Sequence, residues 1–326
     1  MIDLLKKLMF TQGLSGREDK IRDLIKSEIE PYCDQVSTDN VGNLIARKKG
    51  NGKKIMFCAH MDEIGFLATC IDEKGLVRIA PIGGINFLSA SFSEVISENG
   101  VHGVLVPSSN GKEIPKPEET YIDIGAKDKK SAEKKVAPGD FFTFEPKIRR
   151  LQGNRYIGRP FDNRIGCLIL IEAIKAIKKP LNDLYFVFSV QEEVGGRGGK
   201  PASYSVAPDI GINLDVTATG DKPGSSPMSV KLGGGCAIKI IDPSVICSHD
   251  IVEKMKQISK DSKIKAQDEI LLFGGTDTPA MQISGSGARV GAISIPSAFI
   301  HSNVEMIDMG DVKEAIKLTV ALCNKL

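Results

Sequence analysis

The chain has 326 residues, which at about 150 residues per domain predicts roughly two domains, and its net charge is +2. A charge so close to zero gives no strong electrostatic footprint for nucleic acid or an anionic membrane, so neither is expected as a partner. Apolar residues make up 41% of the chain, as in globular proteins, and no apolar run is long enough to span a membrane. The seven cysteines form no CxxC pair, and the N-terminus lacks the order of a signal peptide, so we expect a cytoplasmic protein with reduced thiols.

The first part of the chain predicts two helices followed by a β-hairpin. Apolar residues recur at helical spacing over residues 2–9 and again over 21–29. The segment Ser15–Glu18 has the form of a capping box that would open the second helix. The continuous apolar run 55–59 then predicts a buried strand that ends at His60.

Residues 66–157 predict a small all-β unit, PDZ-like or barrel, that interrupts a larger domain. Short strand-like segments alternate there with turns rich in Gly, Pro, Lys and Ser, and the stretch 108–120 is expected to be a loop. A unit this small has little core of its own, so some of its apolar residues are expected to pack against another subunit. These residues are Phe87, Leu88, Phe92 and Val95.

After residue 158 the pattern alternates between strands and helices, which predicts an α/β fold whose sheet is covered by helices on both faces. The expected strands are 184–190, 210–214, 235–241 and 289–295, and the expected helices are 165–177, 248–260 and 311–325. A capping box that begins at Asp311 would open the last helix. The larger domain is therefore expected to be discontinuous, formed by residues 1–65 and 158–326.

Side chains that can bind metal ions follow the predicted buried strands. Ligand sites in open α/β sheets form beyond the carboxyl ends of the strands, so these segments are expected to meet. The candidates are His60 and Asp62 after the first strand, Glu192 and Glu193 after the second, Asp215 after the third, His301 after the last, and Asp162 at a predicted helix start. A structural role also stays open for each, because buried histidines, solvated strand ends and helix N-caps use the same residue types.

The combination of residue types favours a metal centre. Glu192 and Glu193 repel each other, and a cation would remove this repulsion for one of them and leave the other as a general base. Asp62 lies two residues after His60 and would fix the tautomer of its imidazole. Two histidines with several carboxylates and no cysteine at ligand spacing suit Zn, Co or Mn, and one carboxylate that bridges two ions is the arrangement used by aminopeptidases. The glycine-rich segments match neither a Walker A nor a Rossmann spacing.

Six motifs stand in order along the chain: Ala59–Phe66, Phe161–Gly166, Val190–Gly195, Leu214–Asp215, Gly274–Asp277 and His301–Glu305. As an ordered set they resemble the TET-type aminopeptidases, cobalt- or zinc-dependent metallopeptidases whose members are also called glutamyl aminopeptidase or "cellulase M". The resemblance covers essentially the whole chain. It departs from the usual pattern at Asn303, where a proline is common, and in the loop 194–199, which is richer in glycine.

The resemblance implies two divalent metal ions per subunit, zinc or cobalt, and a role for each candidate residue. One ion would be held by His60, Asp162 and Asp215, and the other by Asp162, Glu193 and His301, with Asp162 bridging. Glu192 would be the general base that acts on the metal-bridging water, and Asp62 would orient His60. The resemblance also implies a zinc-peptidase-like catalytic domain with a mixed sheet, a dimerisation role for the β unit, and dimers that assemble into a tetrahedral homododecamer.

The function expected from these observations is an aminopeptidase that releases N-terminal residues from short peptides. Three alternatives stay open. A related dinuclear site hydrolyses N-acyl amino acids or acts as a carboxypeptidase. An endoglucanase would use paired carboxylates, but it needs neither a metal nor paired histidines. A non-enzymatic peptide-binding scaffold would keep the fold without the full set of ligands.

Overall fold

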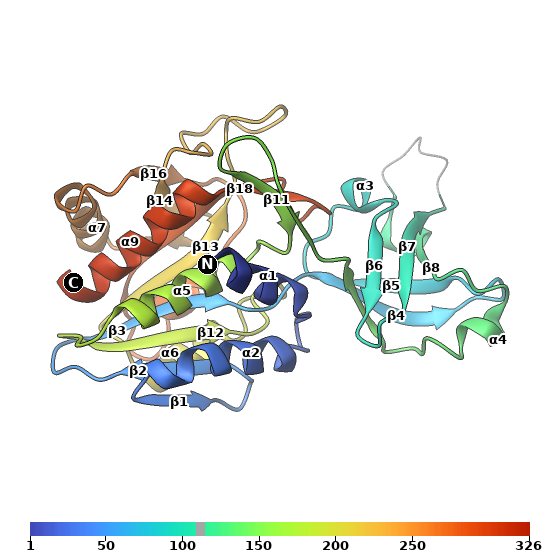
Figure 1. Ribbon diagram of the computed structural model, residues 1–326, viewed down its shortest axis with the longest axis horizontal. Helices are drawn as coiled ribbons and strands as arrows, with labels where there is room; N and C mark the ends of the chain where they lie inside the picture. The colour runs from blue at the N-terminus through green and yellow to red at the C-terminus, as the bar shows by residue number, and fades with distance from the viewer. Residues whose placement is uncertain (109–114) are drawn as a thin grey trace.

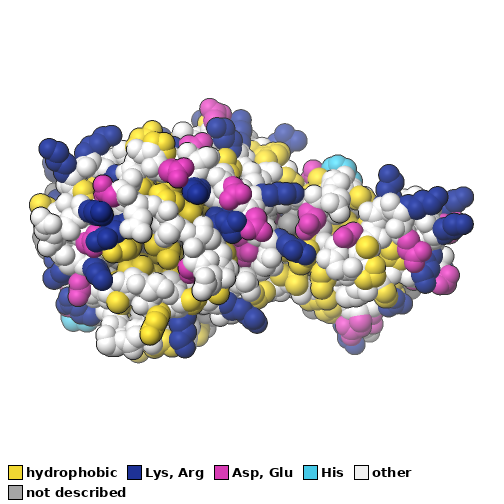
Figure 2. Space-filling view, turned by 90° about the horizontal axis from the view of Figure 1, so that it is seen from below, with side chains coloured by type: hydrophobic (Ala, Val, Ile, Leu, Met, Phe, Trp, Pro, Cys, Tyr) yellow, Lys and Arg dark blue, Asp and Glu magenta, His cyan; other side chains and the backbone are white. Residues whose placement is uncertain are grey.

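The computed structural model describes residues 1–108 and 115–326 and has two parts, a large α/β domain and a β-barrel beside it (Figure 1). The space-filling view shows them as a wide and a narrow lobe, with basic and acidic side chains interspersed over both (Figure 2). None of the helices in the described part of the chain has the length and apolar character that a membrane crossing requires.

Four parallel strands form the centre of the large sheet, in the order β12 (Asp183–Ser189), β3 (Lys54–His60), β13 (Ile210–Thr217) and β17 (Arg289–Ala298). Their residues are almost all buried, because helices cover both faces of the sheet. Since the four strands run the same way, their carboxyl ends lie along one edge. This edge is where the candidate ligands were expected.

Antiparallel strands complete the sheet on both sides, so it is mixed, as expected. One side carries the hairpin β1 (Gln35–Thr38) and β2 (Leu44–Lys48). The other side carries β18 (Glu305–Asp308), β11 (Arg155–Arg159) and β10 (Lys147–Arg150). A branch from β17 adds β14 (Cys236–Asp242), β15 (Val245–Ile246) and β16 (Ala266–Ile270).

Helices pack on each face of the sheet. One face contacts α1 (Ile2–Phe10), α2 (Asp19–Ile29, followed by the 3-10 turn Glu30–Tyr32), α5 (Arg164–Ala176), α7 (His249–Asp261) and α9 (Met309–Lys325). The other contacts the shorter α6 (Gly199–Val206) and α8 (Thr278–Gln282). Alternation along β3 links the two cores, because Phe57 and Ala59 point into the first and Met56 and Cys58 into the second.

The inserted unit is a closed barrel of six antiparallel strands rather than a PDZ-like fold. The strands are β4 (Gly65–Ile71), β5 (Val77–Ile82), β6 (Glu94–Ser97), β7 (His102–Pro107), β8 (Thr120–Asp123) and β9 (Phe141–Phe144). Three short helical segments accompany them, α3 (Phe87–Ala90), α4 (Lys129–Ala132) and the 3-10 turn Pro117–Glu119. The expected fold class is thereby confirmed. Residues 109–114 of the expected loop lie outside the described residues.

The barrel strands span 65–144, whereas the sequence pattern extended the β unit to 157. Strands β10 and β11 within that range pair with β18 of the large sheet. Four apolar residues of the β unit were expected to pack against another subunit, and this expectation is wrong for two of them. Phe87 and Val95 are buried in the barrel core, whereas Leu88 and Phe92 are 60% and 71% exposed.

Both predicted capping boxes are wrong, because tertiary contacts take their side chains. The Ser15 hydroxyl donates to Asp62, and no side chain caps the start of α2. The carboxylate of Asp311 accepts hydrogen bonds from the backbone N–H groups of Gly233 and Gly235. Asp308 caps α9 instead.

Candidate metal centre

The ligand candidates meet at the carboxyl edge of the four parallel strands. His60 is the last residue of β3 and Asp215 lies near the end of β13. Glu193 follows β12, and His301 follows β17. Asp162 lies in the loop between β11 and α5. Five residues that are up to 241 positions apart in the sequence therefore face one another, because parallel strands end at one edge.

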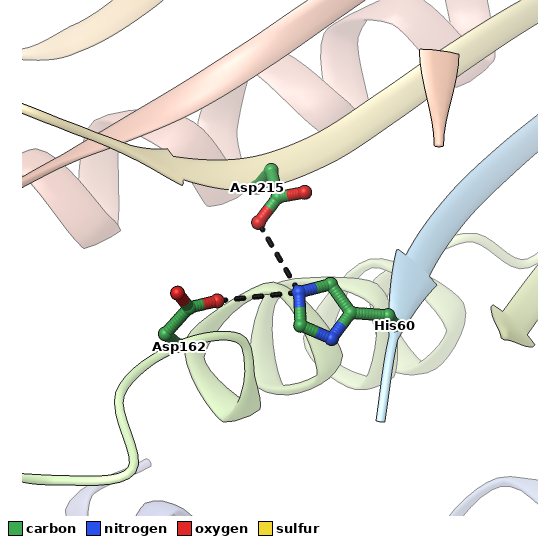
Figure 3. A group of neighbouring side chains, drawn as sticks. All are labelled: His60, Asp162 and Asp215. Atoms are coloured by element: carbon green, nitrogen blue, oxygen red, sulfur yellow. Dashed lines mark ion pairs between the residues drawn. The ribbon is translucent and has the colours of Figure 1, made fainter. Parts of the chain in front are cut away.

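His60, Asp162 and Asp215 form the first group (Figure 3). The Nε2 atom of His60 lies 3.2 Å from Oδ1 of Asp162 and 3.5 Å from Oδ1 of Asp215. All three residues are buried. Figure 3 shows both carboxylates turned toward the same imidazole nitrogen. The three side chains come from strand β3, strand β13 and the loop before α5.

Asp162, Glu193 and His301 form the second group. The Nε2 atom of His301 lies 3.3 Å from Oδ2 of Asp162 and 3.1 Å from Oε2 of Glu193. Asp162 thus belongs to both groups and presents a different oxygen to each. This is the geometry that a carboxylate bridging two cations needs.

The position of Asp162 leaves its side chain free for this role. The next residue, Asn163, is the N-cap of α5, and its side chain accepts a hydrogen bond from the N–H of Gly166. A structural N-cap role for Asp162 is therefore ruled out. The peptide bond between Asp162 and Asn163 is cis.

Asp62 connects His60 to the segment that carries both glutamates. Its Oδ1 atom lies 3.3 Å from Nδ1 of His60 and accepts a hydrogen bond from the N–H of Glu192 at 3.0 Å. Its Oδ2 atom accepts from the Ser15 hydroxyl at 2.6 Å and from the N–H of Glu193 at 3.3 Å. Burial opposes the charge of this carboxylate, but His60 and Ser15 lower the pKa of Asp62. Asp62 therefore contacts the imidazole of His60 and the backbone of both glutamates.

Glu192 lies beside the two groups without belonging to either. Its Oε2 atom is 3.9 Å from Nε2 of His60, and it lines the cavity over the centre. Burial raises the pKa of Glu192 well above its usual value. The preceding residue, Gln191, adopts a left-handed φ of 54° and donates its N–H to Glu18. His301 also has a left-handed φ, of 61°.

The charges of the cluster fit a cation. Burial raises the pKa of Glu193 and of Asp215, which disfavours the charged carboxylates when no cation is near. His301 shows the opposite effect, because Asp162 and Glu193 overcome burial and raise its pKa to about 11. In both groups imidazole nitrogen and carboxylate oxygen point to a common position. Such mixed nitrogen and oxygen donors suit zinc or cobalt, so the residues fit the expected metals.

A cavity of about 950 Å³ opens above the centre. The loop residues Gly274, Gly275 and Thr276, which belong to one of the six motifs, line it. Apart from histidines, the charged residues among its described lining are Asp162, Glu192, Glu193, Asp215, Lys200 and Lys222. The barrel contributes Gly84, where an added Cβ would lie only 3.2 Å from Nδ1 of His301.

Some supporting residues were missed by sequence analysis. Ser15 was assigned to a helix cap, and Glu305 was noted only as part of a motif. Asp277 accepts a hydrogen bond from the Ser189 hydroxyl, and an added Cβ at Gly199 would lie 2.7 Å from its Oδ1. The glycine at position 199 is thus explained by its close approach to Asp277. The signals in the sequence were the positions of Glu305 and Asp277 within two of the six motifs.

Comparison with known proteins identifies the family. The model of the M42 glutamyl aminopeptidase family matches residues 42–318. A putative aminopeptidase from Acetivibrio thermocellus is 45% identical over 326 residues, which cover 99% of this chain and 98% of that protein. The structure of aminopeptidase APDkam598 from Desulfurococcus kamchatkensis has a TM-score of 0.96 at 33% identity, and the match covers 100% of this chain and 94% of that one. The Pyrococcus horikoshii TET1 peptidase, described as able to assemble into a tetrahedron or a large octahedral shell, has a TM-score of 0.90 at 34% identity, with 100% and 99% covered. The chain therefore belongs to the M42 glutamyl aminopeptidase family and is a metallo-aminopeptidase, a hydrolase of peptide bonds.

Proposed function

We propose that this protein releases N-terminal residues from short peptides at a centre of two divalent metal ions, zinc or cobalt. The observation that carries the proposal is the position of Asp162, which faces His60 with one carboxylate oxygen and His301 with the other. A single-ion site would not need a carboxylate shared between two separate groups of ligands.

The proposed ligands are His60, Asp162 and Asp215 for one ion and Asp162, Glu193 and His301 for the other. When bound, the ions supply Lewis-acid polarisation of the scissile carbonyl and lower the pKa of a bound water. The carboxylate of Glu192 takes a proton from the attacking water and later delivers it to the leaving amine. Asp62 holds His60 and the backbone of Glu192 in place throughout.

The chemistry of the centre supports cleavage at the N-terminus. The carboxylates in the described lining of the cavity gather at the metal centre, where they would offset the charge of two divalent ions. A peptide's free α-amine would bind one of the ions or a nearby carboxylate and so lie beside the scissile bond that follows it. A blocked N-terminus lacks this interaction, which separates an aminopeptidase from an N-acyl amino acid hydrolase.

The experiment that tests the proposal combines metal analysis with a substrate panel. We expect about two divalent ions per chain, activity abolished by chelation and restored by Co²⁺ or Zn²⁺, and hydrolysis of aminoacyl-p-nitroanilides. Acyl amino acids, peptides blocked at the N-terminus and carboxymethylcellulose should remain intact. Full peptidase activity in a verified metal-free preparation, or hydrolysis restricted to the blocked substrates, would refute the proposal.

The two adjacent glutamates provide a matched pair of variants. Glu192→Gln should keep the fold and most of the metal but lower kcat by about 10²–10⁴-fold, because the proton acceptor is lost. Glu193→Gln should instead weaken metal binding, because it removes an oxygen 3.1 Å from Nε2 of His301. Near wild-type kcat in Glu192→Gln would show that the role of general base is assigned to the wrong residue.

We also propose that the barrel mediates dimerisation and that dimers close into a homododecamer. The exposed Leu88 and Phe92 of the barrel support an interface, and the Pyrococcus horikoshii relative is described as forming a tetrahedron. Light scattering should give a mass far above 35.2 kDa, and peptides but not folded proteins should be degraded. A stable, fully active monomer at micromolar concentration would contradict this part of the proposal.

A further inference from the structure

A buried ion pair lies directly behind the metal centre. Arg159 at the end of β11 and Glu305 at the start of β18 are 1% and 0% exposed, and Nη1 of Arg159 lies 3.1 Å from Oε1 of Glu305. Neither side chain belongs to the proposed ligand groups or lines the cavity. Two charges are therefore held out of water at a place where the proposed chemistry does not use them directly, and buried pairs of this kind are weak contributors to stability.

The second oxygen of Glu305 holds the bridging ligand. Its Oε2 atom accepts hydrogen bonds from the backbone N–H of Phe161 at 2.6 Å and of Asp162 at 3.1 Å. Charge-assisted hydrogen bonds of this length fix the backbone at Phe161 and Asp162, and with it the start of the Asp162 side chain. That side chain must present one oxygen to each of two imidazoles, so a small rotation of its backbone would disturb both groups.

The cation of the pair holds the loop of the other ligand. Nη1 of Arg159 donates to the carbonyl oxygen of Ser302 at 2.6 Å, and Ser302 follows His301. The guanidinium also lies over the ring of Phe144, 4.5 Å from its centroid. Phe144 belongs to strand β9 of the barrel and is itself buried against Phe66. The pair thus joins three segments: the loop with Asp162, the loop with His301, and the barrel.

We infer that Arg159 and Glu305 are positioning residues that hold Asp162 and His301 at the distance needed to bind one metal ion, the ion of the His301 group. The ring of Phe144 in the barrel packs against Arg159 and helps to hold it in place. The inference rests on the proposed two-metal function. A cation over a buried aromatic ring contributes to binding, so the barrel wall takes part in holding the metal centre. Partners behind metal ligands typically change metal affinity by about 10–100-fold when they are removed.

The test compares metal affinity with stability in matched variants. In Glu305→Gln the amide turns its NH₂ either toward Arg159 or toward the two N–H groups, so one set of bonds is lost. Arg159→Lys keeps the charge but loses the planar guanidinium, and Phe144→Leu removes only the ring beneath it. The control is Asp242→Asn, which alters a buried carboxylate 3.0 Å from the buried Lys239 and bonded to Ser244 and Val245.

Metal-free full-length proteins are titrated with Co²⁺ while cobalt absorbance is recorded, and thermal unfolding of the metal-free forms is measured in parallel. Wild type should bind two Co²⁺. Glu305→Gln should bind the ion of the His301 group about 10–100-fold more weakly, with an altered cobalt spectrum. The ion of the His60 group should show a smaller loss, because only the loop of His301 also depends on Arg159. Arg159→Lys and Phe144→Leu should show smaller losses at the same step. Asp242→Asn should lower the unfolding temperature and leave both affinities unchanged.

Several outcomes would overturn the inference. Wild-type affinity for both ions in a folded Glu305→Gln and in Arg159→Lys would show that the ion pair is only structural. Unchanged cobalt binding in Phe144→Leu would remove the barrel from the argument. Equal loss of metal in Asp242→Asn would mean that any buried charge defect has the same effect. If wild type binds no Co²⁺ at all, the proposed function fails as well, and that result is distinct from the others.

Discussion

Replacement of Asp62 by asparagine tests the connection between the two halves of the metal centre. The side chain is fully buried and accepts from Ser15 and from the N–H groups of Glu192 and Glu193, and it also faces His60. Asparagine keeps the size of aspartate but turns one oxygen into a donor. Whichever way the amide lies, its NH₂ group faces at least one N–H donor.

The magnitude follows from the bonds lost. In the better orientation the amide oxygen keeps the bonds at Oδ1, to Glu192 and His60, and the Ser15 hydroxyl rotates to accept from the NH₂. The N–H of Glu193 then loses its acceptor. A hydrogen bond to a charged group contributes about 1.5–3 kcal/mol, so we expect the free energy of unfolding to fall by about that amount. Because His60 also loses its anionic partner, metal affinity should fall about 10–100-fold.

The assay pairs urea unfolding of the metal-free protein with competition against a chelator of known affinity. Ser15→Ala is the matched control, because it removes one bond to Asp62 and leaves the carboxylate charged. It should destabilise the fold by about 1–2 kcal/mol and keep wild-type metal affinity. If Asp62→Asn also kept wild-type metal affinity and kcat, Asp62 would not position His60 or the glutamates.

Three further predictions concern stability, pH and specificity. Lys239→Met should lower the free energy of unfolding, measured by urea denaturation, by about 3–5 kcal/mol, because it leaves the buried carboxylates of Asp242 and Glu269 without their cation. Lys256→Met, which removes a surface ion pair, should change it by less than about 1 kcal/mol, and equal effects of the two variants would contradict the burial argument. Burial raises the pKa of Glu18 from 4.5 to about 7, so the folded chain keeps a proton that the unfolded chain loses, and stability should fall as pH rises through this window. Glu18→Gln should remove about 2–3 kcal/mol of this pH dependence, and an unchanged pH profile would show that Glu18 titrates normally. Peptides with N-terminal lysine or arginine should have a kcat/KM about tenfold below that of peptides with N-terminal leucine or glutamate. The reason is charge repulsion, because away from the metal centre the charged residues of the described cavity lining are Lys200 and Lys222; equal values of kcat/KM would contradict this prediction.

Much of the fold could be read from local patterns. The run 55–59 is continuous and apolar because β3 is covered on both faces, and the same holds for β12 and β13. Ligand-type residues at the ends of these runs were sufficient to predict that they meet, because parallel strands end at one edge of the sheet. The ordered motifs identified the family, which the comparisons confirm.

The boundaries between the two parts of the molecule depended on long-range pairing. Strands β10 and β11 look like continuations of the β unit, since they are short and separated by turns. They belong to the large sheet only because β11 pairs with β18, about 150 residues later in the chain. Strand pairing between distant segments leaves no periodic signal in either segment.

The sequence by itself determined which chemistry the site can perform, because residue type and strand position are local properties. Only the tertiary structure decided which polar side chains support that site. Ser15 and Asp311 carry clear local signals for helix caps, yet each bonds to a distant segment instead. Arg159 and Glu305 carry no such signal, and their pairing behind Asp162 exists only when β11 and β18 lie side by side. A buried hydrogen bond depends on which groups folding brings within about 3 Å of each other, and for these residues that is decided by the packing of the whole sheet.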